Sequence, residues 1–415
     1  MSCAHGFLQN ETAFAIDASR IVFGAGCLDE LGEHAKTFGA KRIALFTDRA
    51  VGKLEHVSRA RKSLQNANID FALYDAVRVE PTDASFIDAS KFAKEGRFDA
   101  YVSIGGGSTI DTCKAASLYA TFPADFLDYV NAPVGAGKPV PGALPPHIAC
   151  PTTCGTGSET TGIAVCDVLA LSAKTGIASA RLRPSLALVD PTCTYTLPPE
   201  VVAASGFDVL CHALESFTAR PFNGRIAGLP RPMSQGRNPW SDLGSREALR
   251  IGGENLVAAV EGEERARDQL AWAATLAGVA FGNAGVHVPH AMAYAVAGLV
   301  RDFRMRGYPQ EEAMVPHGIS VVLNAPSAFR FTAQTSPERH RVAAEMLGDR
   351  DGDLSRALET LMKKARVPVA LRDVGYTKED VPALVKGTIV QKRLLANAPR
   401  DVGEAELVEL FEGAL

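Results

Sequence analysis

The sequence lacks the features of a membrane-spanning or secreted protein. No apolar run reaches the roughly 18 residues that are needed to cross a bilayer. The first ten residues contain neither a basic segment nor an apolar core, so we expect no signal peptide. The eight cysteines have no regular spacing. This favours reduced thiols in a cytoplasmic compartment, or in an organellar matrix if a transit peptide has been removed.

A strong excess of charge of either sign is also absent. The 43 Lys and Arg residues nearly balance the 47 Asp and Glu residues, which gives a net charge of −4. Nucleic acids and anionic membranes therefore have no general electrostatic reason to bind, and we expect neither as a partner. With 47% hydrophobic and 22% charged residues, the composition is typical of a globular protein.

The length and the pattern of the chain predict two domains. A chain of 415 residues exceeds the roughly 250–300 residues that one hydrophobic core usually holds. In the first half, short β-rich runs alternate with helical stretches, which is typical of a mostly parallel sheet with helices on both faces. The expected strands are Arg42–Thr47, Asp70–Asp75, Ala100–Ile104, His147–Cys150 and Ser185–Val189.

The second half is rich in alanine and leucine and starts with Pro198 and Pro199, which are suited to a helix entry. We therefore predict an α/β domain over residues 1–196 and an all-α domain over residues 197–415. The stretch Pro221–Trp240 is rich in Gly, Pro and Arg and lacks periodicity, which indicates a functional loop or a mobile excursion. The expected helices are Val201–Thr218, Ser241–Glu261, Ala266–Phe281 and His290–Leu299.

Glycines follow the third expected strand and precede a helix. Gly105, Gly106 and Gly107 would let the backbone approach a phosphate, and the helix start offers free N–H groups. Ser108 and Thr109 could cap that helix or bind phosphate oxygens. The alternative is a tight turn that needs glycine only for packing.

Two further polar segments follow strands of the same half. Asp48 comes after the first expected strand, where a carboxylate could accept hydrogen bonds from the ribose of an adenosine, although it could also be a simple turn residue. Residues 151–161 contain many hydroxyls and glycines. They form either a hydrogen-bonded turn or the lining of a ligand cleft, and the density of hydroxyls favours the cleft.

The second half contains a candidate metal site. Asp208 and His212 are four residues apart, so they lie on one face of a helix. His290 and His317 each follow a proline at an expected helix start. Three imidazoles and one carboxylate suit Fe(II) or Zn(II). The alternative for each histidine is a hydrogen-bonded core residue, and a thiolate site is disfavoured because the spacing of Cys150, Cys154 and Cys166 matches no zinc pattern.

Five segments carry a resemblance over nearly the whole chain: residues 105–115 (GGGSTIDTCKA), 151–161 (PTTCGTGSETT), 207–216 (FDVLCHALES), 288–298 (VPHAMAYAVAG) and 315–318 (VPHG). The sequence resembles the iron-containing (group III) alcohol dehydrogenase superfamily, which has the dehydroquinate synthase-like fold. Within it the chain is most similar to the hydroxyacid-oxoacid transhydrogenase branch. That similarity lies in residues 77–86, 205–222, 279–287 and 315–340.

The resemblance implies a dinucleotide-binding α/β domain, an all-α metal-binding domain and an active site between them. It implies a metal held by Asp208, His212, His290 and His317. It implies NAD contacts at Asp48, Gly105, Gly106, Gly107, Ser108, Thr109, Thr152, Thr153, Thr156, Ser158 and Lys174.

The branch implies transfer of a hydride between a hydroxy acid such as 4-hydroxybutyrate and an oxo acid such as 2-oxoglutarate, on a cofactor that stays bound. Because both substrates carry carboxylates, we expect a cationic anchor, with Arg301, Arg330 and Arg393 as candidates. The alternatives are an NAD-dependent alcohol dehydrogenase or maleylacetate-reductase-like enzyme with exchangeable cofactor, a lyase on the same scaffold, and a non-catalytic NAD-binding protein. A homodimer is the default assembly.

The sequence departs from the family at two positions. Tyr294 stands where many members have a histidine that relays the alcohol proton, and its ordinary pKa near 10 makes it a poor base at neutral pH. We therefore hypothesise proton delivery through His287, water or the ribose hydroxyls. Tyr294 stays a candidate catalytic residue beside His287, because its hydroxyl can still donate or accept a hydrogen bond. Cys154 stands where alanine is usual, and we expect no consequence.

Overall fold

The computed structural model describes residues 10–171, 173–227 and 231–415. Its first half is built on a six-stranded sheet in which every pairing is parallel, with the strand order β1-β8-β5-β4-β2-β3. The strands are β1 Arg20–Phe23, β2 Arg42–Phe46, β3 Asp70–Tyr74, β4 Ala100–Gly105, β5 His147–Pro151 and β8 Leu186–Val189. All five expected strands are therefore confirmed, and β1 is an addition.

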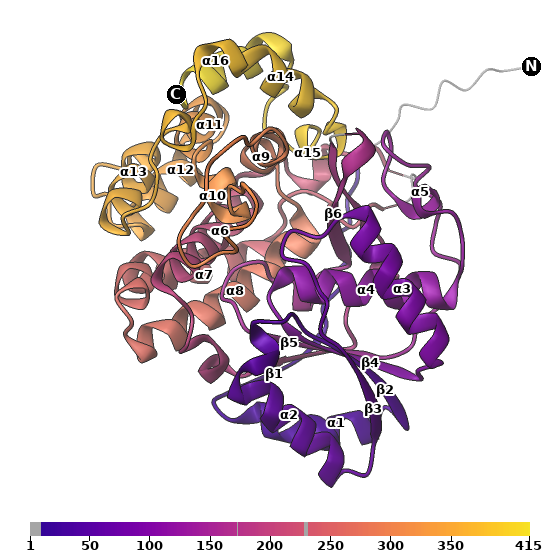
Figure 1. The fold of residues 1–415 in the computed structure, drawn as a ribbon. Coiled ribbons are helices and arrows are strands. Elements are labelled where there is room, and N and C mark those ends of the chain that lie inside the picture. Colours follow the sequence, from indigo (N-terminus) through magenta and orange to yellow (C-terminus); the bar gives the residue numbers. More distant parts are fainter. Residues whose placement is uncertain (1–9, 172, 228–230) are drawn as a thin grey trace, which may run out of the picture.

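Helices cover both faces of this sheet (Figure 1). Along β2, Ile43 and Leu45 pack with α1 (Leu31–Thr37) and α2 (Glu55–Asn66), whereas Ala44 and Phe46 pack with α3 (Asp83–Gly96) and α4 (Gly107–Thr121). This alternation follows from the two-residue period of a strand. It explains why β2 reads as a nearly continuous apolar run, which is typical of a sheet buried on both faces.

A small antiparallel hairpin was not expected from the sequence. It consists of β6 (Ile163–Val168) and β7 (Ala173–Ala178), which form a separate two-stranded sheet, and Asp167 of β6 also forms a single parallel bridge with Thr82. β6 contacts α3 and α4, and β7 contacts α9 (Val288–Gly298) of the helical half. The hairpin therefore connects the two halves of the molecule.

Within the part that the structure describes, the named elements of the second half are all helices, and its core is the largest apolar cluster. The central helix α6 (Pro199–Thr218) is buried from Val202 to Thr218 and contacts α7, α8, α9 and α10. The remaining helices are α7 Pro239–Val260, α8 Glu264–Ala284, α10 His317–Val322, α11 Ala325–Thr332, α12 Pro337–Met346, α13 Leu354–Lys364, α14 Val381–Ile389, α15 Lys392–Leu395 and α16 Glu404–Glu412.

The proposed domain boundary falls in the connection between β8 and α6. Part of the chain before β1, however, lies on the helical half: the Glu11 backbone N–H donates to the carbonyl of Arg225, and the Asp17 N–H donates to Asn283 Oδ1. Asn10 also pairs with Ile226 in a β-bridge. The assignment of residues 1–196 to one domain therefore needs this segment as an exception, and residues 1–9 lie outside the described part.

Much of the aperiodic stretch Pro221–Trp240 is held in place. Pro221 bridges to Arg237, and the Gln235 N–H donates to the carbonyl of Asn283 at the end of α8. Residues 228–230 lie outside the described part. The described ends of the stretch therefore pack against the helical half and do not form a free excursion.

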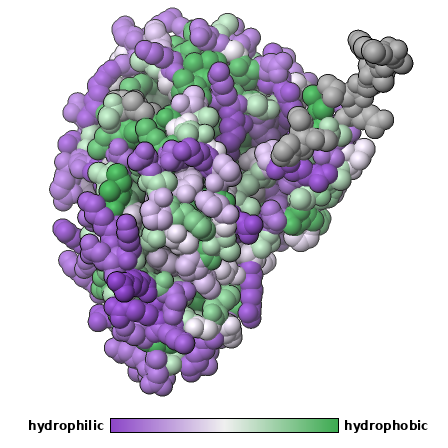
Figure 2. Space-filling view, turned by 90° about the vertical axis from the view of Figure 1, so that its right-hand side faces the viewer, coloured by the Kyte–Doolittle hydropathy of each residue, from purple (hydrophilic) through white to green (hydrophobic). Residues whose placement is uncertain are grey.

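Among the described residues, no helix combines the length and the apolar character that a membrane crossing requires. On the face shown in Figure 2, hydrophilic side chains occupy much of the surface, with smaller apolar areas between them. The seven described cysteines are free thiols and buried.

Candidate active site

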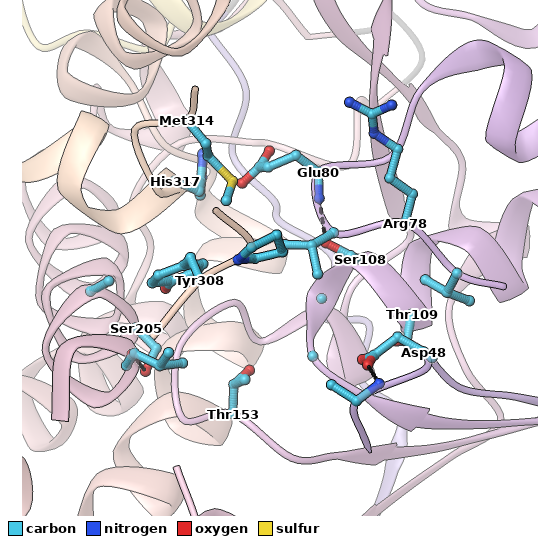
Figure 3. Close-up of a pocket in the computed structure, with 18 of the residues that line it drawn as sticks. Asp48, Arg78, Glu80, Ser108, Thr109, Thr153, Ser205, Tyr308, Met314 and His317 are labelled. Carbon is cyan, nitrogen blue, oxygen red and sulfur yellow. Dashed lines mark hydrogen bonds between the residues drawn. The ribbon is translucent and has the colours of Figure 1, made fainter. Parts of the chain in front are cut away.

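A cavity of about 1000 Å³ lies between the sheet and the helical half, at the carboxyl ends of β2, β4 and β5. Open α/β sheets bind ligands at this edge. The predicted site residues that line it are Asp48, Gly106, Gly107, Ser108, Thr109, Thr152, Thr153, Thr156, Lys174, Asp208 and His317. Figure 3 shows Asp48 and Thr109 toward the sheet and His317 at the other end.

The glycines of the loop after β4 are required by close packing. A Cβ on Gly107 would lie 2.6 Å from Thr156 Cγ2, and one on Gly106 would lie 3.1 Å from Thr153 Cγ2. The loop after β5 is thus pressed against the loop after β4, and the Thr152 N–H donates to the carbonyl of Gly105. Two polar loops and the start of α4 therefore form one continuous cradle that suits a phosphate group.

Asp48 closes the sheet end of the cavity. Its Oδ1 accepts hydrogen bonds from the backbone N–H groups of Ala50 at 2.8 Å and Val51 at 2.9 Å. These bonds fix the carboxylate, and they account for the turn role that the sequence left open. The residue also lines the cavity, so a second role toward a ribose stays a prediction.

Two of the expected cofactor residues do not line the cavity. Gly105 faces Thr109 of its own loop, and Ser158 belongs to a buried network in which its Oγ lies 2.5 Å from both Lys114 Nζ and Asp111 Oδ1. Burial opposes the charge of Lys114 and lowers its pKa, although Asp111 opposes this effect. The network is better suited to holding α4 against the loop after β5 than to binding a ligand.

The four predicted metal ligands converge. Asp208 Oδ1 lies 3.6 Å from His212 Nε2, 3.5 Å from His290 Nε2 and 3.8 Å from His317 Nε2. They come from α6, α9 and α10, which contact one another. The i, i+4 spacing along α6 and the two prolines before His290 and His317 therefore bring together residues that are far apart in the sequence.

The donor atoms of this cluster fit a divalent cation. Asp208 Oδ1 and His290 Nε2 are buried and have no hydrogen-bond partner among the described residues. Buried polar atoms without partners are costly, and a cation at their centre would satisfy them together. The ligand atoms of Asp208, His212 and His290 lie within 4.8 Å of one another, which suits a single ion.

The protonation states of the cluster follow from burial and from the carboxylates. Burial lowers the pKa of His212 to about 4, although the Asp208 carboxylate opposes this effect. Burial alone would raise the pKa of Asp208, but His212 and His317 hold it well below its usual range. The carboxylate is therefore ionised and His212 is neutral at physiological pH, which are the forms that bind a metal.

Sequence reasoning missed Glu215, which supports the cluster from behind. Its Oε1 lies 2.5 Å from His290 Nδ1, and its Oε2 accepts from the backbone N–H of His287 at 2.6 Å. Burial works against a charged imidazole, but the carboxylates of Glu215 and Asp208 together outweigh it and raise the pKa of His290 to about 9. A carboxylate on the far nitrogen turns Nε2 toward the metal position. Glu215 follows Asp208 by seven positions, so the same helix face could have indicated it.

Gly318 explains how His317 reaches the cluster. A Cβ at this position would lie 1.9 Å from the carbonyl oxygen of Ala204 and 3.1 Å from the Cβ of Asp208. Only glycine therefore lets the first turn of α10 approach α6 this closely.

Glu80 is a second residue that sequence reasoning missed. It lines the cavity, has a left-handed backbone with φ of 53°, and its N–H donates to Ser108 Oγ at 3.1 Å (Figure 3). Its Oε2 lies 2.7 Å from Lys174 Nζ, which also pairs with Asp167 at 3.2 Å. Burial opposes the charge of Lys174, but the two carboxylates raise its pKa above the usual value. Lys174 therefore lines the cavity but is already paired with two carboxylates, and its contact with NAD stays a prediction.

The two proposed relay residues are placed differently from the predicted metal ligands. The His287 ring is buried, lies 3.0 Å from Thr218 Oγ1 through Nε2 and packs edge-on against Phe329. It does not line the cavity, so its position favours a role in fixing the start of α9. Tyr294 lies one helical turn beyond His290 and packs against Leu394 and Leu395.

The fold and the site together define a class of two-domain protein in which a helical half can hold a divalent metal beside a cleft suited to a dinucleotide. The chain belongs to the iron-containing alcohol dehydrogenase family. The family model described as iron-containing alcohol dehydrogenase matches residues 18–191, and the model of the C-terminal domain of the Fe-containing family matches residues 231–415.

Curated relatives match nearly the whole chain. The mitochondrial hydroxyacid-oxoacid transhydrogenase of Xenopus tropicalis is 49% identical over 423 residues, which cover 98% of this chain and 91% of the relative. The human protein of the same name is 48% identical, and the match covers 97% of this chain and 90% of the human protein.

Solved structures confirm the fold. A 1,3-propanediol oxidoreductase has a TM-score of 0.85 at 27% identity, and the match covers 97% of this chain and all of that one. An alcohol dehydrogenase from Oenococcus oeni has a TM-score of 0.85 at 26% identity, with coverage of 97% and 100%.

Proposed function

We propose that this enzyme is a hydroxyacid-oxoacid transhydrogenase. The observation that carries the proposal is the 49% identity to a relative of that name over 98% of the chain. The cluster of Asp208, His212, His290 and His317 supports it, because Asp208 and His317 line the cavity and the four side chains together offer the ligands for the divalent metal that the reaction requires.

The proposed reaction couples an oxidation to a reduction. 4-Hydroxybutyrate loses a hydride from its carbinol carbon and a proton from its hydroxyl, and becomes succinate semialdehyde. 2-Oxoglutarate gains a hydride at its ketone carbon and a proton at the ketone oxygen, and becomes 2-hydroxyglutarate. The two half-reactions balance without a net oxidant.

The residues of the chain would supply binding and orientation. Asp208 and the three histidines would hold the metal, and the cradle around Gly106, Gly107 and Ser108 would hold the pyrophosphate of NAD. When bound, the cation stabilises negative charge on the substrate oxygen and the nicotinamide carries the hydride. Because one cavity spans both sites, it would hold the two reactants in contact for transfer.

We further propose that NAD stays bound through the cycle and that the metal is Fe(II) or Zn(II), since both accept imidazole and carboxylate ligands. Proton transfer through Tyr294 stays part of the proposal. Replacing Tyr294 by Phe and His287 by Ala tests the two side chains, and unchanged turnover in both variants would remove them from the relay.

The function is tested by incubating purified protein with 4-hydroxybutyrate and 2-oxoglutarate without added NAD. We expect stoichiometric formation of succinate semialdehyde and 2-hydroxyglutarate, together with NAD(H) and metal in the mass spectrum of the native protein. A requirement for millimolar NAD and indifference to 2-oxoglutarate would instead identify an alcohol dehydrogenase or maleylacetate-reductase-like enzyme with exchangeable cofactor.

A further inference from the structure

Carboxylate substrates require a cation near the metal site, and most of the candidate cations are already paired. Arg301 pairs with Asp380, Arg330 pairs with Glu359 at 3.6 Å, and Lys174 is held by two carboxylates. These cations are therefore neutralised by the protein itself.

Arg393 is different. Among the described residues it has no carboxylate partner, and its Nη1 lies 3.5 Å from the hydroxyl of Ser234. Its side chain is exposed to solvent, so an incoming anion can reach it.

The position of Arg393 relates it to the metal ligands. It lies on α15, which packs on α9, the helix that carries His290 (Figure 1). Its neighbours Leu394 and Leu395 pack with Tyr294. Tyr294 is four residues beyond His290, and so one helical turn, about 5.4 Å, further along the same face.

The electrostatics of Tyr294 agree with this placement. Burial raises the pKa of Tyr294, and the strongest opposing effect comes from Arg393, followed by Lys174. The backbone of Lys174 is in turn linked to the start of α15, since Gln391 Nε2 donates to its carbonyl at 3.4 Å. Tyr294 is therefore one helical turn from His290 along α9, and it is close enough to Arg393 to be affected by the charge of the guanidinium.

We propose that Arg393 binds the remote carboxylate of the substrate, with Tyr294 lining the path from the metal ligands to this anchor. The inference rests on the proposed function. In 4-hydroxybutyrate, two methylene groups separate the reacting carbon from the carboxylate carbon. The same two methylene groups separate the ketone carbon of 2-oxoglutarate from its distal carboxylate. One anchor therefore serves both half-reactions and selects this spacing.

The test compares Arg393→Gln, Arg393→Lys and the control Arg330→Gln on 4-hydroxybutyrate and on butane-1,4-diol, which lacks the carboxylate. Loss of a charged hydrogen-bond partner should raise KM for 4-hydroxybutyrate in Arg393→Gln by roughly 10- to 100-fold. The value for the diol should stay within about twofold, since no carboxylate is bound. Arg393→Lys should recover part of the loss, and Arg330→Gln should resemble the wild type.

Chain length gives a second readout. Wild-type enzyme should use 4-hydroxybutyrate better than 3-hydroxypropanoate or 5-hydroxypentanoate, and Arg393→Gln should lose this preference.

In Arg393→Gln, an equal rise of KM for 4-hydroxybutyrate and for the diol would overturn the anchor, and so would an unchanged preference for 4-hydroxybutyrate over the other two hydroxy acids. The transhydrogenase function would stand in both cases. A wild-type enzyme that does not oxidise 4-hydroxybutyrate at the expense of 2-oxoglutarate would overturn both.

Discussion

Asp208, His212 and Glu215 follow one another on α6 at intervals of four and three residues, so one face of a buried helix carries two predicted metal ligands and the carboxylate that contacts a third, His290. Asp208 and His212 could be predicted as a pair from the sequence, because burying an acid and an imidazole inside an apolar helix is costly unless they have a partner. Glu215 was missed because its partner, His290, is 75 positions away.

Glu215 should be needed for tight metal binding. Replacing it by Gln removes the charge that orients His290 while keeping the size, and such changes typically weaken metal affinity 10- to 100-fold. We expect Glu215→Gln to lose metal on dialysis against a weak chelator, as measured by elemental analysis. Glu247→Gln, on the exposed side of α7, is the control. Metal retention equal to that of the wild type would contradict the supporting role.

His147 should make the fold sensitive to acid. Burial lowers its pKa to about 3, with Ser103 Oγ at 2.8 Å from Nε2. The unfolded chain has the ordinary value near 6.5, so it binds a proton that the folded chain does not. The contribution of the neutral His147 to the free energy of unfolding is therefore fully present above pH 6.5. It is lost as the pH falls toward 3, by about 1.4 kcal/mol per pH unit.

His147→Gln should flatten this dependence. The urea midpoint of the variant should fall less than that of the wild type between pH 7 and pH 4.5. Parallel curves for the two proteins would show that His147 does not account for the acid sensitivity.

At the scale of elements, strand and helix positions could be predicted where one pattern dominates. The apolar run of β2 and the alanine-rich α8 are examples, and both were expected close to their actual bounds. The β6–β7 hairpin could not be predicted, because its alternation is interrupted by Gly176 and its position depends on α3, α4 and α9. The pairing of Lys174 with Glu80, 94 positions away, was hidden for the same reason.

The approach of α10 to α6 gives a prediction at this scale. Gly318→Ala would place a methyl group against the Ala204 carbonyl, and overpacking of this kind typically costs about 1–3 kcal/mol. We expect a lower unfolding midpoint and loss of metal, since His317 moves with the helix. Gly24→Ala is a matched control, because a Cβ there has no atom within 4 Å. Equal stability and metal content in the two variants would contradict the packing argument.

At the scale of the whole molecule, the family could be recognised from the sequence because its motifs are long, and the comparisons confirm it. The placement of the residues before β1 on the helical half could not be predicted, since no local sequence pattern links Glu11 to Arg225. The site lies where the sheet edge meets α6, α9 and α10, so each half of the chain supplies one part of it.

The assembly and the compartment stay predictions. We expect a homodimer of about twice 44.0 kDa in light scattering after gel filtration, and a monomeric mass would contradict it. The curated relatives carry mitochondrial names, which agrees with an organellar matrix as one of the two expected locations.

The most direct test of the account follows the hydride itself. Purified enzyme receives 4-hydroxybutyrate with two deuterium atoms on the carbinol carbon, unlabelled 2-oxoglutarate and no added NAD. The account predicts 2-hydroxyglutarate with one deuterium at C2, formed in equal amount to succinate semialdehyde. Unlabelled 2-hydroxyglutarate, or no product until NAD is added, would contradict it.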